Sequence, residues 1–103
     1  MNRKEQLIAL LQENPADSFV QHALALEWIK EGNDSKAQEI FEELLSENPG
    51  YIGSYYHLAK LYERREQTGL AIQTYEKGME QAKQAGERHA YNELQSALEY
   101  LLY

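Results

Sequence analysis

The feature that most constrains this chain is an internal repeat, because Asn14-Pro15 recurs as Asn48-Pro49 after an interval of 34 residues. Other apolar residues keep the same interval: Leu24-Ala25 with Leu58-Ala59, Trp28 with Tyr62, Ala37 with Ala71, and Phe41 with Tyr75. Such a period, with helical spacing inside each unit, is typical of helical solenoids. A solenoid offers a surface for holding another molecule, so the repeat favours binding over catalysis.

Prolines, glycines and polar clusters divide the chain into six predicted helices. We expect them at about 3–13, 17–31, 34–48, 51–65, 69–84 and 87–102. Ser35 and Gln38 suggest a capping box for the third helix, and Thr68 is a favourable N-cap for the fifth. The loops between these helices are short, so neighbouring helices should run antiparallel.

Small and large apolar residues define the expected core. Close approach within each helix pair requires Ala25 to face Ala37 and Ala59 to face Ala71. The aromatic residues should then fill the space between successive pairs: Trp28, Phe41, Tyr62 and Tyr75. The flanking helices should pack through Leu7, Leu10 and Leu11 at one end and through Tyr91, Leu94, Leu98 and Leu101 at the other. We also expect the apolar end of the chain, residues 99–103, to be docked.

Aligned on this interval, the first unit reads Gln21-x2-Leu24-Ala25-x2-Trp28, followed by Ala37-x3-Phe41 and Pro49. The second reads Tyr55-x2-Leu58-Ala59-x2-Tyr62, followed by Ala71-x3-Tyr75. This pattern resembles the tetratricopeptide repeat, and the segment 86–98 is similar to the tails of small bacterial members. The resemblance implies an all-α, antiparallel, right-handed helix-hairpin solenoid. It implies one domain over 1–103, with a leading helix (1–15), two repeats (16–49 and 50–83) and a capping helix (84–103).

Three residues depart from the family pattern. Gln21 stands where an aromatic residue is preferred, so the start of the first repeat should be looser. Glu66 replaces the usual turn glycine, so this turn should be built differently. Gly78 lies inside the fifth helix, where glycine costs about 1 kcal/mol relative to alanine. Either a close approach of the sixth helix explains it, or it is a tolerated lapse.

The resemblance also implies a concave groove lined by the first helix of each pair. It assigns this groove to Phe19, His22, Leu26, Ile29, Lys30, Gly53, Tyr56, Lys60, Glu63 and Arg64, and on the sixth helix to His89, Asn92, Ser96 and Glu99. Two of the tyrosines that the pattern does not explain, Tyr56 and Tyr100, are either binding or packing residues, since tyrosine suits both roles.

Three residues of the second helix, Phe19, Leu26 and Ile29, form an additional apolar stripe. A helix that is apolar nearly all round is normally covered. A partner segment, the chain's own first or sixth helix, or a second copy of the chain could cover it. The leading hypothesis is therefore a non-catalytic adaptor that binds a peptide or helix, and the alternative is a self-assembling homodimer that buries the same stripe. A third, remote hypothesis is an enzyme that uses His22 or His57 with a carboxylate.

The composition of the chain restricts the classes of partner that it is expected to bind. The chain has no cysteine and a net charge of -7, which would repel a nucleic acid on average and suits a neutral or basic protein partner. Its three histidines lack the spacing of a zinc site, so we expect no metal and no cofactor. No apolar run reaches the length of a membrane span, and no secretory signal is recognisable. We therefore expect a cytoplasmic protein that contacts no membrane.

Overall fold

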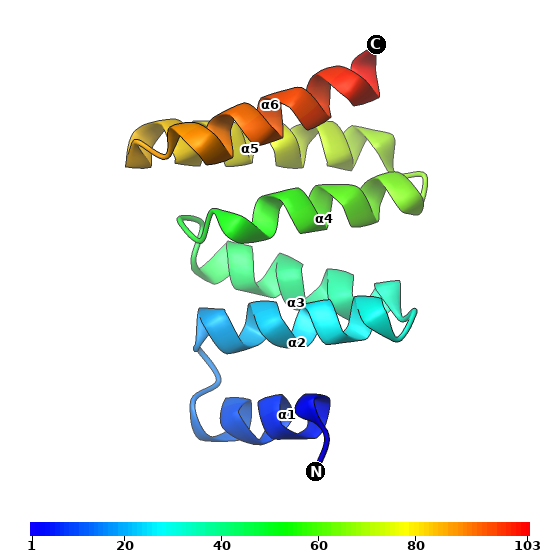
Figure 1. Cartoon of the computed structure of the whole chain (residues 1–103), viewed down its shortest axis with the longest axis vertical. Coiled ribbons are helices and arrows are strands. Elements are labelled where there is room, and N and C mark those ends of the chain that lie inside the picture. The colour runs from blue at the N-terminus through cyan, green and yellow to red at the C-terminus, as the bar shows by residue number, and fades with distance from the viewer. The chain divides into compact units, whose positions relative to one another are not determined.

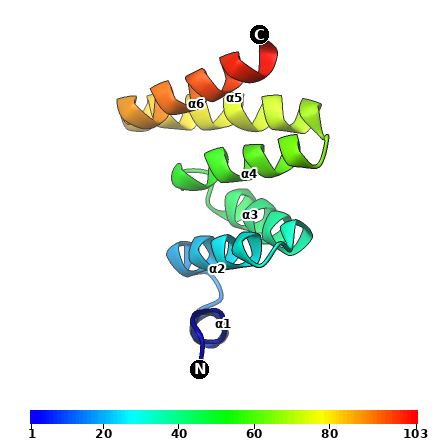
Figure 2. The ribbon, with the colours of Figure 1, turned by 45° about the vertical axis from the view of Figure 1, so that its right-hand side comes forward.

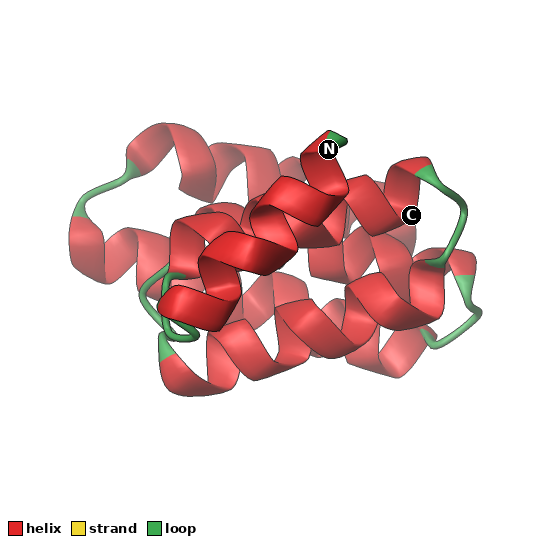
Figure 3. Cartoon of the chain, turned by 90° about the horizontal axis from the view of Figure 1, so that it is seen from below, coloured by secondary structure: helices red, strands yellow, loops and turns green.

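The computed structural model describes residues 1–103 and contains only α-helices and loops (Figure 3). The six helices, labelled in Figure 1, are α1 (Arg3–Glu13), α2 (Ser18–Lys30), α3 (Asp34–Glu47), α4 (Gly53–Arg64), α5 (Thr68–Ala85) and α6 (Arg88–Leu102). The prediction of an all-α chain with about six helices is confirmed. None of the helices is both long enough and apolar enough to cross a membrane.

The chain divides into two compact units, which are described separately. Unit 1 comprises Met1–Asn48 with α1, α2 and α3, and unit 2 comprises Pro49–Tyr103 with α4, α5 and α6. In unit 1, α2 packs against α3 and α1 against α2; in unit 2, α5 packs against both α4 and α6. The boundary falls between Asn48 and Pro49, within the second Asn-Pro pair.

The core of unit 1 follows the predicted alanine pattern. Ala25 of α2 and Ala37 of α3 are completely buried, as is Phe41. Trp28 is only partly buried, and the Nζ atom of Lys4 lies 4.3 Å from the centre of its ring. A cation above an indole ring is attracted by the ring's negative face, so Lys4 of α1 covers the part of Trp28 that the core leaves open.

Helix α1 departs from the prediction in two ways. Leu7 is buried and Leu11 packs against the same cluster, but Leu10 is 49% exposed, so the three leucines do not share a buried face. In Figure 2, α1 is seen nearly end-on while α2 is seen from the side. The first helix therefore crosses α2 instead of lying antiparallel along it, and this crossing leaves Leu10 outside the contact.

Unit 2 is built around a close approach at Gly78 of α5. A Cβ atom at this position would lie 2.7 Å from Cβ of Tyr55 and 3.0 Å from Cδ1 of Leu94. The expectation that α6 explains this glycine is therefore only partly right, because the nearest neighbour belongs to α4. Tyr55 is almost fully buried, so its large ring requires a residue without a side chain opposite it.

The turn after α4 is built like the turn after α2, contrary to expectation. Gly32 has φ 81° and Glu66, its equivalent 34 residues later, has φ 60°. Both turns close with the same hydrogen bonds: Asn33 N to Trp28 O and Gln67 N to Tyr62 O, each 2.8 Å long. Glu66 thus adopts the left-handed conformation that normally favours glycine, and accepts strain to keep the geometry of the repeat.

Gln21 also preserves the geometry of the repeat, so the prediction of a looser start is wrong. Its side chain is 7% exposed, and Nε2 donates a 3.0 Å hydrogen bond to the carbonyl oxygen of Pro15. At the equivalent position in unit 2, the Tyr55 hydroxyl donates to the carbonyl oxygen of Pro49. An amide and a phenol therefore make the same link between a helix and the proline before it.

Two predictions about helix capping are wrong. Asn33, not Ser35, caps α3: its side chain accepts from the backbone N–H of Lys36, while Gln38 donates to Glu42. Thr68 is the first residue of α5, and its side chain does not cap the helix.

The chain end is not docked as expected. Tyr100 is 86% exposed and Tyr103 is 98% exposed.

Candidate functional site

Unit 2 carries an open groove between α4 and α6, with a volume of about 480 Å³. Its walls are formed by Tyr56 and Lys60 of α4 and by His89, Asn92, Glu93, Ser96, Ala97 and Tyr100 of α6. The positions of the buried residues along the two helices produce this arrangement. Tyr55, Leu58 and Leu94 face inward, so the residues that flank them on the helical wheel line the opening.

On the α4 side, a charged network holds Lys60 in place. Its Nζ atom lies 3.6 Å from Oε2 of Glu63 and 5.6 Å from the centre of the Tyr56 ring. Glu63 also accepts a hydrogen bond from the buried Tyr75 hydroxyl. Burial and this bond to a carboxylate both raise the pKa of Tyr75 well above its usual value. Glu63 therefore links Lys60 to the buried Tyr75.

On the α6 side, the groove is polar and exposed. Nε2 of His89 lies 3.7 Å from Oε2 of Glu93, and both side chains are more than half exposed, at 95% and 54%. His89 thus interacts along its own helix. Asn92 and Ser96 add further polar groups, and Tyr100 supplies an exposed aromatic ring.

The structure brings together some of the residues predicted for the groove. Tyr56, Lys60 and Asn92 line one opening, as do His89 and Ser96. Glu63 lies behind Lys60, and Arg64, in the last turn of α4, does not line this groove. Glu99 and Gly53 do not line it either.

Sequence reasoning missed Glu93 and Ala97 and did not assign Tyr100 to the groove. These three residues follow one another at intervals of four and three along α6. They therefore share a helix face next to the buried face of Leu94 and Leu98. The positions of Leu94 and Leu98 in the sequence could have identified these three residues.

The five predicted residues of α2 belong to unit 1 and differ in their surroundings. Phe19 is 68% exposed, whereas Leu26 and Ile29 are half-buried. His22 packs edge-on against Phe41, with ring centres 5.5 Å apart. Lys30 instead lines a separate cleft of about 440 Å³ beside α1, together with Asn2, Arg3, Lys4, Glu27 and Glu31. The α2 residues therefore do not form one uniform apolar surface.

The histidines show no arrangement for metal binding, since no three His, Asp or Glu side chains come together as a ligand set. His57 is half-buried on α4, and burial lowers its pKa, although the charge of Glu93 acts in the opposite direction. Its ring lies edge-on to Tyr56, with centres 5.8 Å apart. The half-burial and the ring contact are those of a packing residue.

Comparisons with known proteins agree with the repeat architecture. A family model described as tetratricopeptide repeat matches residues 29–98. A tetratricopeptide repeat domain protein from Salinibacter ruber, solved in solution, is 45% identical, with 85% of this chain and 89% of that chain covered and a TM-score of 0.82. A crystal structure of such a protein from the same organism gives 46% identity, coverage of 82% and 94%, and a TM-score of 0.79.

A more distant structure shows the fold alone. A solution structure from Bordetella parapertussis is 22% identical, covers 99% of this chain and 89% of its own, and has a TM-score of 0.83. Among curated proteins, no match is found.

Proposed function

Because the chain belongs to the tetratricopeptide repeat family, we propose that it is an adaptor that holds a partner's peptide or helix in the groove of unit 2. Proteins of this family are generally non-catalytic scaffolds that bind other proteins. The proposal includes a single domain with a leading helix (1–15), two repeats (16–49 and 50–83) and a capping helix (84–103). It also includes a cytoplasmic location.

The observation that carries this proposal is the pairing of two tyrosines with polar groups in one opening. Tyr56 of α4 is half-buried and Tyr100 of α6 is 86% exposed, and both line the same groove. Tyrosine rings provide large contact areas with few rotatable bonds, and they are frequent in the energetic centres of interfaces. The amide of Asn92 and the hydroxyl of Ser96 can bond to a peptide backbone.

The charges of the groove favour a neutral or basic segment. The single lysine that lines it is already paired with Glu63 at 3.6 Å. Glu93 lies 3.7 Å from His89 and also acts on the charge of His57, and its side chain remains 54% exposed. A basic side chain of the partner could therefore approach Glu93, which is a form of charge complementarity that favours the correct partner.

This proposal can be tested without knowing the partner. Peptides are selected from a random phage library on the full chain, and their dissociation constants are measured by fluorescence polarisation. We expect Tyr56→Ser and Tyr100→Ser to weaken binding by about tenfold or more each, because both rings would lose their contact area. The matched control is Tyr103→Ser, which removes a 98% exposed tyrosine outside the groove and should leave binding unchanged.

Equal affinity for the wild type and both groove variants would contradict the proposal, as would selected peptides that shift only unit 1 amides in NMR spectra. Circular dichroism confirms that each variant remains folded.

A second candidate function, self-assembly into a homodimer, rests on Phe19. This aromatic side chain is 68% exposed on α2, beside the half-buried Leu26 and Ile29. Sedimentation velocity at micromolar concentrations tests it. A concentration-dependent dimer that Phe19→Ser abolishes would support self-assembly, and a monomer over the whole range would exclude it.

A further inference from the structure

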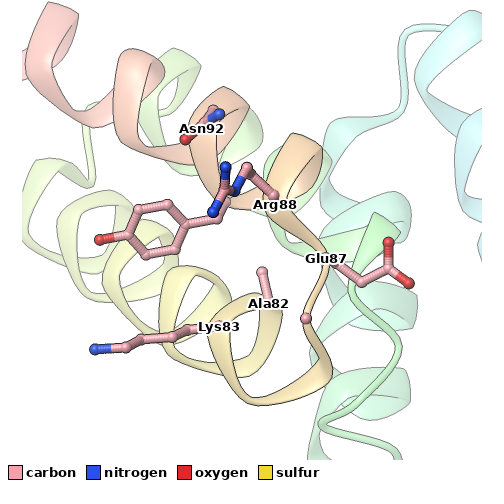
Figure 4. A pocket seen from close by; sticks show the side chains of 7 residues that line it. Ala82, Lys83, Glu87, Arg88 and Asn92 are labelled. Carbon is pink, nitrogen blue, oxygen red and sulfur yellow. The ribbon is translucent and has the colours of Figure 1, made fainter.

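A second cavity lies at the turn that joins α5 to α6 (Figure 4). It has a volume of about 400 Å³ and is lined by Ala82, Lys83, Gly86, Glu87, Arg88, Tyr91 and Asn92. The turn itself opens this space. Gly86 adopts φ 72°, and a side chain built there would meet no atom within 4 Å.

Two cations line this cavity without a counter-charge. Lys83 lies in the last turn of α5 and Arg88 is the first residue of α6, and neither side chain makes an ion pair or hydrogen bond. By contrast, Arg3, Lys4 and Lys60 each pair with a glutamate. In a chain with a net charge of -7, these two cations line the same cavity and have no carboxylate paired with them.

The two cations lie on different walls of the cavity. Figure 4 shows Lys83 extending from α5 on the lower wall and Arg88 extending from α6 on the upper wall. The carboxylate of Glu87 points away from both of them, so it does not neutralise them.

The remaining residues that line the cavity include both polar and apolar side chains. Asn92 adds an amide that can donate a hydrogen bond, while Ala82 and the half-buried Tyr91 form an apolar surface beside the cations. Apolar surroundings exclude water and therefore strengthen charge-assisted hydrogen bonds.

We propose that this cavity binds an oxyanion, a carboxylate or a phosphate monoester, between Lys83 and Arg88. The guanidinium of Arg88 offers paired donors that match the oxygens of such a group, and the ammonium of Lys83 contributes a second positive charge. Asn92 supplies a neutral donor to the same group. This site is distinct from the groove between α4 and α6, with which it shares only Asn92, and it does not depend on the groove binding a peptide.

An NMR titration of the full chain tests this inference. Sodium phosphate and sodium acetate are added separately to ¹⁵N-labelled protein, with sodium chloride holding the ionic strength constant. We expect saturable shifts of the backbone amides of residues 83–92 with at least one of the two anions and none with chloride alone. The anion that saturates at the lower concentration identifies the preferred oxyanion.

Matched variants separate the site from general electrostatics. The double variant Lys83→Gln/Arg88→Gln should weaken binding by about tenfold or more, because each charged hydrogen bond contributes substantially. Lys77→Gln removes an exposed, unpaired cation of α5 that does not line the cavity. This control should bind as the wild type does. The conservative variant Arg88→Lys, which retains the charge but loses the paired donors, should show an intermediate loss.

Shifts that remain linear at every concentration would overturn the inference, as would equal affinities of the wild type and the double variant. Either result would mean that Lys83 serves only to stabilise the carbonyl end of α5. Thermal unfolding of each variant shows whether it is folded, and Arg88→Lys keeps the test decisive if the double variant is not.

Discussion

The two repeats reach the same helix-hairpin geometry with different residues, and the differences show which positions are interchangeable. Unit 1 places Gln21 and Leu44 where unit 2, at an interval of 34 residues, places Tyr55 and Gly78. Unit 1 combines two side chains of similar size, whereas unit 2 combines a large ring with a glycine, and all four residues are buried. In this volume exchange between the units, the large ring of Tyr55 is accompanied by a residue without a side chain.

The two units also differ in how their helices are capped. In unit 1 the side chains of Asn2, Asp17 and Asn33 each accept a backbone hydrogen bond at a helix start. None of the three helices in unit 2 has such a bond. Unit 2 must therefore derive more of its stability from packing around Tyr55, Tyr75 and Leu94.

The strongest challenge to this comparison is Gly78→Leu, which installs the unit 1 residue in unit 2. Even a Cβ atom would lie 2.7 Å from Cβ of Tyr55, so we expect a loss of about 3 kcal/mol in the free energy of unfolding. Adding Tyr55→Gln should recover part of this loss, because it recreates the unit 1 pair. Urea denaturation measures both variants, and a double variant less stable than the sum of its two single changes would refute the volume exchange.

The shared hydrogen bond to proline gives the next largest effect. Tyr55→Phe removes the donor to the Pro49 carbonyl, and we expect a loss of about 1 kcal/mol. Gln21→Met should cost a similar amount by removing the donor to the Pro15 carbonyl. Thermal or urea unfolding measures the stability of both variants. A loss of stability in only one of the two variants would contradict the equivalence of the two hydrogen bonds.

The two turns provide a reciprocal exchange. Glu66→Gly should stabilise the protein by about 0.5–1 kcal/mol, because it relieves the left-handed backbone of Glu66 while adding some freedom to the unfolded chain. Gly32→Glu should destabilise the protein, since φ at Gly32 is 81°. Calorimetry compares the melting temperatures. We expect the melting temperature to rise for Glu66→Gly and to fall for Gly32→Glu. Changes in the same direction would contradict the assignment of backbone strain to Glu66.

The missing cap of α5 can be supplied from unit 1. Gln67 is equivalent to Asn33, but it does not cap its helix, and its Oε1 atom is buried without a hydrogen-bond partner. Gln67→Asn should add about 0.5 kcal/mol or more by bonding to the first turn of α5. The matched control, Asn33→Gln, should lose a comparable amount. Urea midpoints measure both, and no gain in the first variant would show that backbone geometry prevents the cap.

The smallest effect concerns pH and also distinguishes the units. Burial lowers the pKa of His57 in unit 2 below its unfolded value. Between these two pKa values the unfolded chain binds a proton that the folded chain does not, so the free energy of unfolding should fall as pH decreases from 7 toward 5. His57→Gln should flatten this dependence in urea titrations, and an unchanged slope would contradict the assignment.

The fold was largely predictable because repeat periodicity is local information. Ala25, Ala37, Ala59 and Ala71 recur at the expected interval, and all are fully buried. The helix boundaries followed from prolines and glycines, and the largest difference is at α4, expected from Tyr51 but beginning at Gly53. The capping predictions failed at Ser35 and Thr68 because several adjacent residues can cap, and only backbone geometry selects one.

The groove was predictable only in part. The family pattern grouped Tyr56, Lys60 and Asn92, which line one opening, but it could not show that Glu63 is held by Tyr75, twelve residues away in the chain. Leu10 is likewise exposed, contrary to the prediction, because α1 crosses α2.

The helices, the repeat and the alanine contacts could be predicted from the amino-acid sequence, because they depend on residues spaced within one or two helical turns or one repeat. Tertiary packing was needed to show which polar side chains face an opening, which are held by buried partners, and that Lys83 and Arg88 line one cavity. Those outcomes depend on crossing angles and rotamers, which arise from packing between distant segments.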